Sequence, residues 1–484
     1  MKNKIHSVKY NFIMNFILTS SQFLFPLITF PYVSRILQAT GNGKIAFAAS
    51  VANYFLMVAS LGIPTYGVRA CAQVREDRDK LSKTVQEIFF INSVMTLLVM
   101  LTYFICLLYV PKFQTEKTLF YINAVNIVLN LFGINWLYQA MEQYDYITFR
   151  SLAFKVISIA LMFLLVHQQG DYVIYAAISV FAAGGSNILN FIRSHRFVNF
   201  KYYGNYEIRK HLKPIFILFA QSLAVSIYTN LDTVMLGFIR TDTDVGYYQA
   251  AIKVKSVLLS LVSSLGNVLL PRMSYYAKNK MENEFNQTML KALNFTVMLS
   301  LPLGMYFVLF ARESILLLAG IGYIGAIHAM QIITITVIPI GITGILGVQV
   351  LTAIEKEKYV LYSVIAGATV DFMLNLALIS QYGSAGAAMA TTIAEFVVLF
   401  VQLFFAKSLI RNIRDGFRLH IYFILSLIAS LVSIWTKICG CLSSPVILVL
   451  SSLIYFGIYG IGLIIFKEPV VIDVINSLRK KESK

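Results

Sequence analysis

The sequence has few charged residues for its length. Of its 484 residues, 13% are charged and 58% are hydrophobic, and the mean hydropathy is +0.72. An average soluble protein has about 25% charged and about 45–50% apolar residues. This shortage of charge excludes an ordinary soluble enzyme and an intrinsically disordered chain.

Residue types used in metal binding and covalent catalysis are also scarce. The four cysteines and six histidines are scattered, so no disulfide framework and no metal-ligand spacing can be identified. Cys439 and Cys441 alone are too few for a zinc site. The pattern Gly-x-Gly-x-x-Gly at 320–325 lies in an expected loop and not between a strand and a helix. We therefore expect no enzymatic activity, no catalytic residues, no cofactor and no metal.

The chain instead contains long continuous apolar runs. Each is close to the roughly 20 residues that a helix needs to cross a bilayer. Outer-membrane strands alternate apolar and polar residues over about 10 positions, a pattern that these runs do not follow. We expect an all-α, polytopic membrane protein with about fourteen transmembrane helices, at approximately 10–34, 44–68, 85–109, 118–141, 151–168, 171–192, 214–239, 244–270, 289–311, 322–351, 359–380, 383–406, 419–437 and 444–466.

The distribution of basic residues predicts the orientation of these helices. The net charge is +17, from 40 Lys and Arg against 23 Asp and Glu. Fourteen helices place both termini on one side, and 31 of the 40 basic residues fall in loops and helix ends on that side, against 7 on the other. The positive-inside rule then predicts that both termini are cytoplasmic. No basic stretch is long enough to form a nucleic-acid-binding domain, so we expect no nucleic acid as a partner.

An internal repeat divides the helices into two sets. The motif Ala-x-Glu-x-x-x-Tyr occurs at 140–146 and again at 353–359, an offset of 213 residues, and Gly43 matches Gly246 at an offset of 203. These matches predict two six-helix lobes, at 1–200 and 201–412, followed by two additional helices and a tail at 413–484. Because six is even, the two lobes point the same way, as in transporters that bind a substrate between such lobes. Duplication in a membrane protein that transports nothing is the alternative.

Polar residues recur at helical spacing inside several of the expected spans. Lipid cannot satisfy such groups, so they should face other helices or a wet cavity. We expect the cavity-lining residues to include Asn11, Asn15, Gln22, Asn126, Asn130 and Asn230. Contacts that only hold helices together are the other interpretation of each stripe.

Ionisable residues within membrane helices are costly and indicate function. Asp232 and Lys253 lie at matched depth in consecutive antiparallel helices, so we expect them to pair. Asp371 and Glu395 fall near the midplane of their helices and are candidates for a proton or cation site.

Three segments resemble the polysaccharide-biosynthesis flippases. These segments are Phe30-Pro-Tyr-Val-Ser-Arg-Ile-Leu37 with Gly41-x-Gly43, Leu61-Gly-Ile-Pro-x-Tyr-Gly-x-Arg69, and Asn230-Leu-Asp-Thr-Val-Met-Leu-Gly237 with Gly246-Tyr-Tyr. The resemblance covers nearly the whole chain. It identifies the chain as similar to Wzx-type flippases of oligosaccharide repeat units, in the multidrug/oligosaccharidyl-lipid/polysaccharide exporter superfamily. One departure is Gln38-Ala-Thr40, where the family often has Gly-Pro.

The resemblance implies a substrate, a location and partners. The substrate would be an undecaprenyl-diphosphate-linked oligosaccharide, moved from the inner to the outer leaflet of the bacterial cytoplasmic membrane by alternating access, for synthesis of capsule or another surface polysaccharide. The polymerase and glycosyltransferases of the same pathway are expected partners. Basic side chains bind diphosphate through charge-assisted hydrogen bonds, and our candidates for diphosphate or sugar contacts are Arg35, Arg69, Lys253 and Lys255.

Two other functions stay open at this point. A drug or small-cation exporter of the same superfamily would need central acids, which Asp371 and Glu395 could supply. A polytopic polysaccharide polymerase or glycosyltransferase would typically need a sizeable outer loop, and the sequence has none of that length.

Overall fold

The computed structural model describes residues 8–263, 266–438, 443–469 and 471–472. In these residues every regular element is helical and no β-strand occurs, so the expected all-α class is confirmed. Cys439, Cys441 and the two ends of the chain lie outside the described residues. The cytoplasmic position of both termini therefore stays a prediction.

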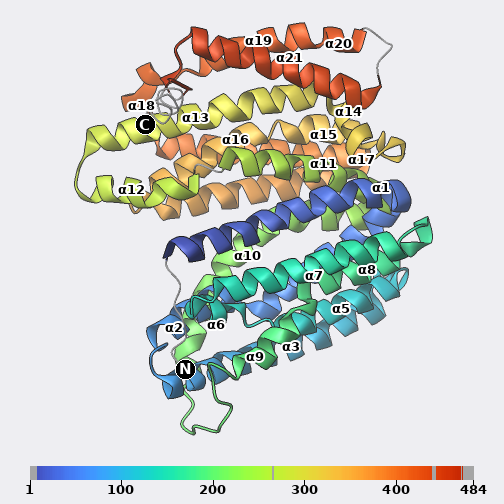
Figure 1. Cartoon of the computed structure of the whole chain (residues 1–484), viewed down its shortest axis with the longest axis vertical. Helices are drawn as coiled ribbons and strands as arrows, with labels where there is room; N and C mark the ends of the chain where they lie inside the picture. The colour runs from blue at the N-terminus through green and yellow to red at the C-terminus, as the bar shows by residue number, and fades with distance from the viewer. Residues whose placement is uncertain (1–7, 264–265, 439–442, 470, 473–484) are drawn as a thin grey trace. The chain divides into compact units, whose positions relative to one another are not determined.

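The chain forms two compact units, Met1–Gly246 and Tyr247–Lys484, called unit 1 and unit 2. The helices of unit 1 are α1 (Val8–Ser60), α2 (Ile63–Gln73), α3 (Arg78–Tyr109), α4 (Pro111–Gln114), α5 (Lys117–Leu131), α6 (Asn135–Ala140), α7 (Tyr144–Leu165), η1 (Gln169–Asp171), α8 (Tyr172–Val180), η2 (Phe181–Gly185), α9 (Asn187–Ser194) and α10 (Ile208–Ile239) (Figure 1). The next helix, α11 (Asp242–Val262), begins in unit 1 and continues into unit 2.

Unit 2 contains the remaining helices of the chain. They are α12 (Gly266–Lys278), α13 (Glu282–Leu309), α14 (Ala311–Leu318), η4 (Ile321–Tyr323), α15 (Ala326–Thr334), α16 (Val337–Thr343), η5 (Gly344–Leu351), α17 (Glu357–Phe405), α18 (Lys407–Ile413), η6 (Arg414–Gly416), α19 (Leu419–Ser433), α20 (Trp435–Ile438) and α21 (Ser444–Ile465). Within this unit α19 and α21 lie side by side, and α13 packs against α19 (Figure 1).

Among the described residues, ten helical segments are long and apolar enough to cross a membrane. Two of the longest helices, α1 and α17, each change direction at one non-helical residue, Gln38 (φ 58°) and Gly383 (φ 55°). Each of the two therefore holds two of the spans expected from the sequence. The helices α10 and α11 have 32 and 21 residues and are not among the ten. A polytopic membrane fold is thus confirmed, while the number fourteen stays a prediction.

The two copies of the repeated motif adopt the same backbone turn. Glu142 and Glu355, at equivalent positions, both have left-handed backbone, with φ of 55° and 58°. In each copy the next N–H closes the helix by bonding five residues back, from Gln143 to Tyr138 at 2.9 Å and from Lys356 to Leu351 at 2.8 Å. This Schellman-type ending places the same stop after both helices and supports an internal repeat.

The helix α10 belongs to unit 1 by its packing, since it lies against α1, α2 and α3. Its sequence falls after the expected boundary at residue 200. The division into lobes at 1–200 and 201–412, with 413–484 added, stays a prediction.

Candidate functional site

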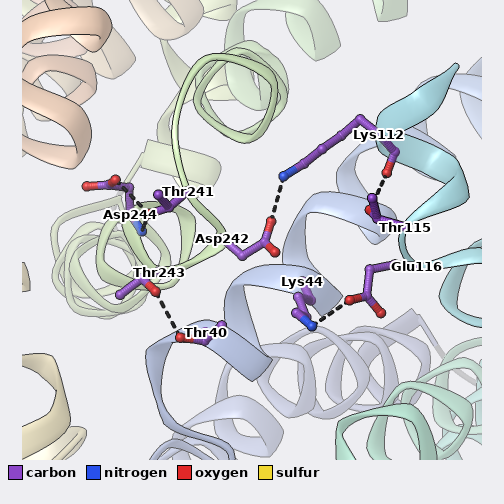
Figure 2. A network of polar contacts seen from close by, with 9 residues as sticks. All are labelled: Thr40, Lys44, Lys112, Thr115, Glu116, Thr241, Asp242, Thr243 and Asp244. Carbon is purple, nitrogen blue, oxygen red and sulfur yellow. Dashed lines mark hydrogen bonds and ion pairs between the residues drawn. The ribbon is translucent and has the colours of Figure 1, made fainter.

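One end of unit 1 is built around the turn of α1 at Gln38, and we call it the kink end. The α1 backbone changes direction at Gln38. The turn from α10 to α11 lies against the residues that follow, where Thr243 faces Thr40 (Figure 2). A Cβ atom on Gly43 would overlap the carbonyl oxygen of Asp242, and one on Gly246 would overlap that of Ala39. Only glycine permits two backbones to approach this closely.

The contacts at the kink end join residues at equivalent positions of the repeat. Thr40 and Thr243 are 203 residues apart in the sequence, as are Gly43 and Gly246. The hydroxyl oxygens of Thr40 and Thr243 lie 2.8 Å apart (Figure 2). Thr241 closes the second turn by hydrogen bonding with Asp244, at 2.8 Å between Oγ1 and Oδ2. The sequence offset alone did not reveal that the two copies meet here.

We call the contact between the α1 turn and the α10–α11 turn the seam. Two ion pairs lie close to it, and we call them the kink-end pairs. Lys112 Nζ lies 3.1 Å from Asp242 Oδ1, and Lys44 Nζ lies 2.5 Å from Glu116 Oε1 (Figure 2). Tyr172 donates a hydrogen bond of 2.9 Å to the second oxygen of Glu116, and the Lys44 ammonium lies 4.9 Å from the centre of the Tyr172 ring. The Lys112 and Asp242 side chains are 30% and 20% exposed, so water screens them in part.

The opposite end of α10 is held by a buried network, which we call the α2-end clamp. His211 of α10 bridges two helices: its Nδ1 lies 2.7 Å from the Tyr66 hydroxyl of α2, and its Nε2 lies 2.7 Å from Glu87 Oε2 of α3. The Glu87 and His211 side chains are only 0% and 3% exposed. The backbone N–H of Glu207 donates to Glu87 Oε1 at 2.7 Å, and Lys210 Nζ lies 3.4 Å from Oε2. Both carboxylate oxygens of the buried acid are thus satisfied.

Glycine again sets the spacing at this end. A Cβ on Gly62 would collide with the α10 backbone at Ile215, and one on Gly67 would collide with the indole of Trp136. Pro64 stands in the first turn of α2, where its missing N–H costs nothing. The segment 61–69, identified from sequence as a family motif, therefore seats α2 between α10 and α6.

The four predicted basic residues are distributed over both units. In unit 1, Arg35 and Arg69 are exposed, and the Arg69 guanidinium lies 5.5 Å from the centre of the Tyr66 ring. In unit 2, Lys253 and Lys255 on α11 are half-buried. Their roles in binding stay predictions.

The three predicted acids are all buried. Asp232 lies on α10 in unit 1, whereas Asp371 and Glu395 lie on the two arms of α17 in unit 2. Because Asp232 and Lys253 fall in different units, their pairing stays a prediction.

The predicted cavity residues divide into exposed and engaged side chains. Asn15 and Gln22 on α1 are exposed. Asn11 is buried and donates to Glu142 Oε2 at 3.4 Å, and Asn130 donates to Ser60 Oγ at 2.7 Å. Asn126 and Asn230 are half-buried. The amides of Asn11 and Asn130 therefore bond to other helices, while Asn15 and Gln22 are exposed, and the cavity-lining role of all six residues stays a prediction.

Sequence reasoning missed the residues that hold α10. His211 is one of six scattered histidines, and Glu87 and Tyr66 lie 124 and 145 residues away from it. Spacing along the chain carries no signal of such a contact. No group of three or more His, Cys, Asp and Glu that could hold a metal ion occurs among the described residues.

Comparisons with known proteins match this architecture. The model of the family described as "Polysaccharide biosynthesis protein" matches residues 8–277, and the MatE family model matches residues 218–377. A protein of Escherichia coli (strain K12) named "Putative O-antigen transporter" is 24% identical over 410 residues, which cover 84% of this chain and 98% of that protein.

Two solved structures share the fold. The lipid II flippase MurJ in an inward closed conformation aligns with a TM-score of 0.75 at 17% identity, over 95% of this chain and 100% of that one. A multidrug resistance MATE family transporter in an inward-facing conformation aligns with a TM-score of 0.59 at 12% identity, over 80% and 98% of the two chains. These relatives are transporters and flippases and not enzymes. The chain belongs to the polysaccharide biosynthesis protein family, and the resemblance to Wzx-type flippases that the sequence motifs predicted is confirmed.

Proposed function

We propose that the protein moves an undecaprenyl-diphosphate-linked oligosaccharide from the inner to the outer leaflet of the bacterial cytoplasmic membrane. The observation that carries the proposal is the polar face of α1. Asn15, Thr19 and Gln22 follow one another at helical spacing and are all exposed, and Arg35 is exposed further along the same helix. Lipid cannot satisfy these groups, so they need a wet path, which a sugar chain and its diphosphate also need.

The physical problem that such a path solves is the barrier of the hydrocarbon core. A charged, hydroxyl-rich head group cannot cross about 30 Å of hydrocarbon unaided. Amides can replace the water around sugar hydroxyls, and Arg35, Arg69, Lys253 and Lys255 are our candidates for contacts with the diphosphate or the sugar. The lipid tail can stay in the bilayer throughout.

We place the kink end on the outer side, because the basic residues favour cytoplasmic termini. Alternating access then requires the seam between the α1 turn and the α10–α11 turn to part when the outer side opens. Of the kink-end pairs, Lys112–Asp242 involves the α10–α11 turn, and its partly exposed, screened side chains are suited to breaking and re-forming. The α2-end clamp is buried, and it would keep the inner end of α10 attached to unit 1.

The membrane potential can bias the direction of movement. With the cell interior negative, each negative charge that moves outward gains about 2.3 kcal/mol per 100 mV. Asp371 and Glu395 are our candidates for a coupled proton or cation, since buried acids within membrane helices are costly unless used. We expect Asp371→Asn and Glu395→Gln to change the pH dependence of transport. Unchanged rates and pH profiles in both variants would remove them from the coupling scheme.

The decisive experiment follows the lipid-linked oligosaccharide in cells. Deletion of the gene should strand it on the inner leaflet, out of reach of an external probe such as a lectin or a glycosidase, and should abolish the surface polymer. The native chain should restore both, and Arg35→Ala or Lys253→Ala should restore them poorly. Unchanged access of the probe in the deletion strain, with polymer still made and no second flippase present, would refute the proposal.

A drug or small-cation exporter is the second candidate. The match of the MatE model to residues 218–377 and the buried acids of unit 2 favour it. An exporter of this kind would change the sensitivity of cells to cationic drugs and leave the surface polymer intact. Measuring both drug sensitivity and surface polymer in the deletion strain separates the two functions.

A flippase would also depend on the polymerase and glycosyltransferases of its pathway, which we propose as partners.

A further inference from the structure

Unit 1 contains a cavity to which the proposed function has so far assigned no role. It lies between the end of α1, the start of α2, α3, α5 and α6, and its volume is about 110 Å³. One water molecule needs roughly 10–15 Å³ by the same measure. The cavity therefore has room for more than one or two waters, and the exposed Pro64 in its lining indicates that it reaches the surface of the unit.

The lining of this cavity is rich in amides and carries no charge. Its polar members are Ser60, Asn92, Asn130, Asn135 and Gln139, and Trp136 contributes an aromatic wall. The indole of Trp136 is fixed in place because it rests on Gly67, where any Cβ would collide with the ring. The cavity is therefore part of the fold and not a loose gap between helices.

Asn92 is the residue that most needs a ligand. It is 5% exposed, and its Oδ1 atom has no hydrogen-bond partner among the described residues. Leaving a buried amide unsatisfied costs about 1–3 kcal/mol. Asn130, another amide of the lining, by contrast donates a hydrogen bond to Ser60 Oγ.

Hydrogen bonds to neighbouring protein groups fix the orientation of the amides of Asn135 and Asn130. Asn135 Oδ1 accepts from Arg150 Nη2 at 3.1 Å and from Asn190 Nδ2 at 2.7 Å, so its own NH₂ is left to donate. Asn130 uses its NH₂ on Ser60, so its Oδ1 is left to accept. The cavity thus offers donors and acceptors side by side.

This pattern selects among chemical classes of ligand. A phosphate would need a basic residue in the lining, and a cation would need an acid, and neither is present among the lining residues. The Arg150 guanidinium behind Asn135 further disfavours a cation. Sugar hydroxyls donate and accept at once, and the apolar faces of sugar rings pack on aromatic rings. Amides with one aromatic wall suit them.

We propose that this cavity binds one uncharged sugar residue of the transported oligosaccharide. The inference rests on the proposed function and deepens it, because it assigns the recognition of the sugar to unit 1, apart from the basic residues assigned to the diphosphate. Asn92 provides hydrogen bonds to the sugar, together with Asn130 and Asn135.

The chain contains two tryptophans, Trp136 and Trp435, which allows a direct binding test. In a Trp435→Phe background Trp136 is the only indole, so its emission reports on the cavity. The probe is the oligosaccharide released by mild acid from the lipid fraction of cells that lack the protein. We expect a saturable change in Trp136 emission, weakened at least tenfold by Asn92→Leu.

Asn123→Leu is the matched control. Asn123 is also 5% exposed and lies on α5, but its amide bonds to Leu119 within its own helix and it does not line the cavity. It should bind the oligosaccharide with the affinity of the parent. Thermal unfolding of both variants checks that each is folded, and Gln139→Ala, at a half-buried position, provides a milder second variant.

The outcomes separate this inference from the proposed function. If the deletion strain accumulates no lipid-linked oligosaccharide, the proposed function fails. If it accumulates one that leaves Trp136 emission unchanged, or that changes it equally in Asn92→Leu, the cavity holds water only and this inference alone is overturned. Wild-type flipping by folded Asn92→Leu would also overturn it.

Discussion

The two ends of α10 are held in contrasting ways. At the kink end, the partly exposed Lys112–Asp242 pair and a close contact of glycine backbone hold the α10–α11 turn. At the α2 end, a buried carboxylate, imidazole and phenol bridge three helices. An exposed pair gives back little when it forms and costs little when it breaks. A buried pair is costly to break, because each partner left behind lacks water. For the alternating access that we propose, this contrast favours release of α10 at the kink end and attachment at the α2 end.

The largest effect should follow from removing the buried imidazole. His211→Ala removes one of the two groups that lie 2.7 Å from the buried Glu87 carboxylate, which should lower the free energy of unfolding by about 3–5 kcal/mol. Thermal unfolding of the purified protein measures this loss. His195→Ala is the control, since His195 is exposed. A similar stability for both variants would contradict the contrast between the two ends.

A side chain placed in the seam should have the next largest effect. Gly43→Val must push the α1 turn away from Asp242, and overpacking of this kind typically costs about 1–3 kcal/mol. We expect a cysteine at position 40 to react faster with an impermeant thiol reagent in this variant. Gly170→Val serves as the control, because nothing lies within 4 Å of a Cβ at Gly170. Equal reactivity in the two variants would show that the seam is not closed by this contact.

A smaller effect is expected from the kink-end pairs. A double-mutant cycle of Lys112→Gln and Asp242→Asn should give a coupling energy of about 0.2–1 kcal/mol, and added salt should reduce it. Lys117→Gln, at an exposed lysine five residues after Lys112 for which no ion pair is seen among the described residues, gives the background effect of losing one charge. A coupling energy as large as the stability loss expected for His211→Ala would remove the distinction between the two ends of α10.

The smallest effect concerns an exposed charge at the α2 end. Asp77 caps α3, and the backbone N–H of Lys80, with the Lys80 ammonium, holds the pKa of the Asp77 carboxyl below its ordinary value. A lowered pKa in the folded state means that this stabilisation is present above the ordinary pKa and is lost as the pH falls through the lowered value. Asp77→Asn should therefore flatten the acid side of the stability profile slightly. A change at neutral pH as large as that of His211→Ala would show that burial is not what separates the two kinds of contact.

Much of the fold follows from local pattern. The apolar runs predict the helices, and the repeat predicts that Glu142 and Glu355 occupy equivalent places, where both adopt the same turn. The sequence shows the glycines of the family motifs, but it does not show which backbone each one approaches. Gly62 allows α10 to pack closely, and Gly43 allows the start of α11 to do so.

The contacts of the candidate site follow less well from sequence. In a membrane, apolar residues cover all sides of a helix. Hydrophobic periodicity therefore does not indicate which face of a helix packs against another helix and which face contacts lipid. The prediction treated Asn11 and Asn130 as one class with Asn15 and Gln22, although the first two bond to other helices. The partners of His211 are fixed by tertiary packing alone.

The seam at the kink end has the contact pattern of a symmetric dimer. Gly43 approaches the residue at 242 and Gly246 approaches the residue at 39, while Thr40 meets its own counterpart at 243. In an isologous interface between identical subunits, residue i contacts j and residue j contacts i, and residues on the two-fold axis contact themselves. A gene duplication that fused two copies of such a subunit would preserve this arrangement within a single chain. The threonine pair then marks where the axis of the ancestral pair passed.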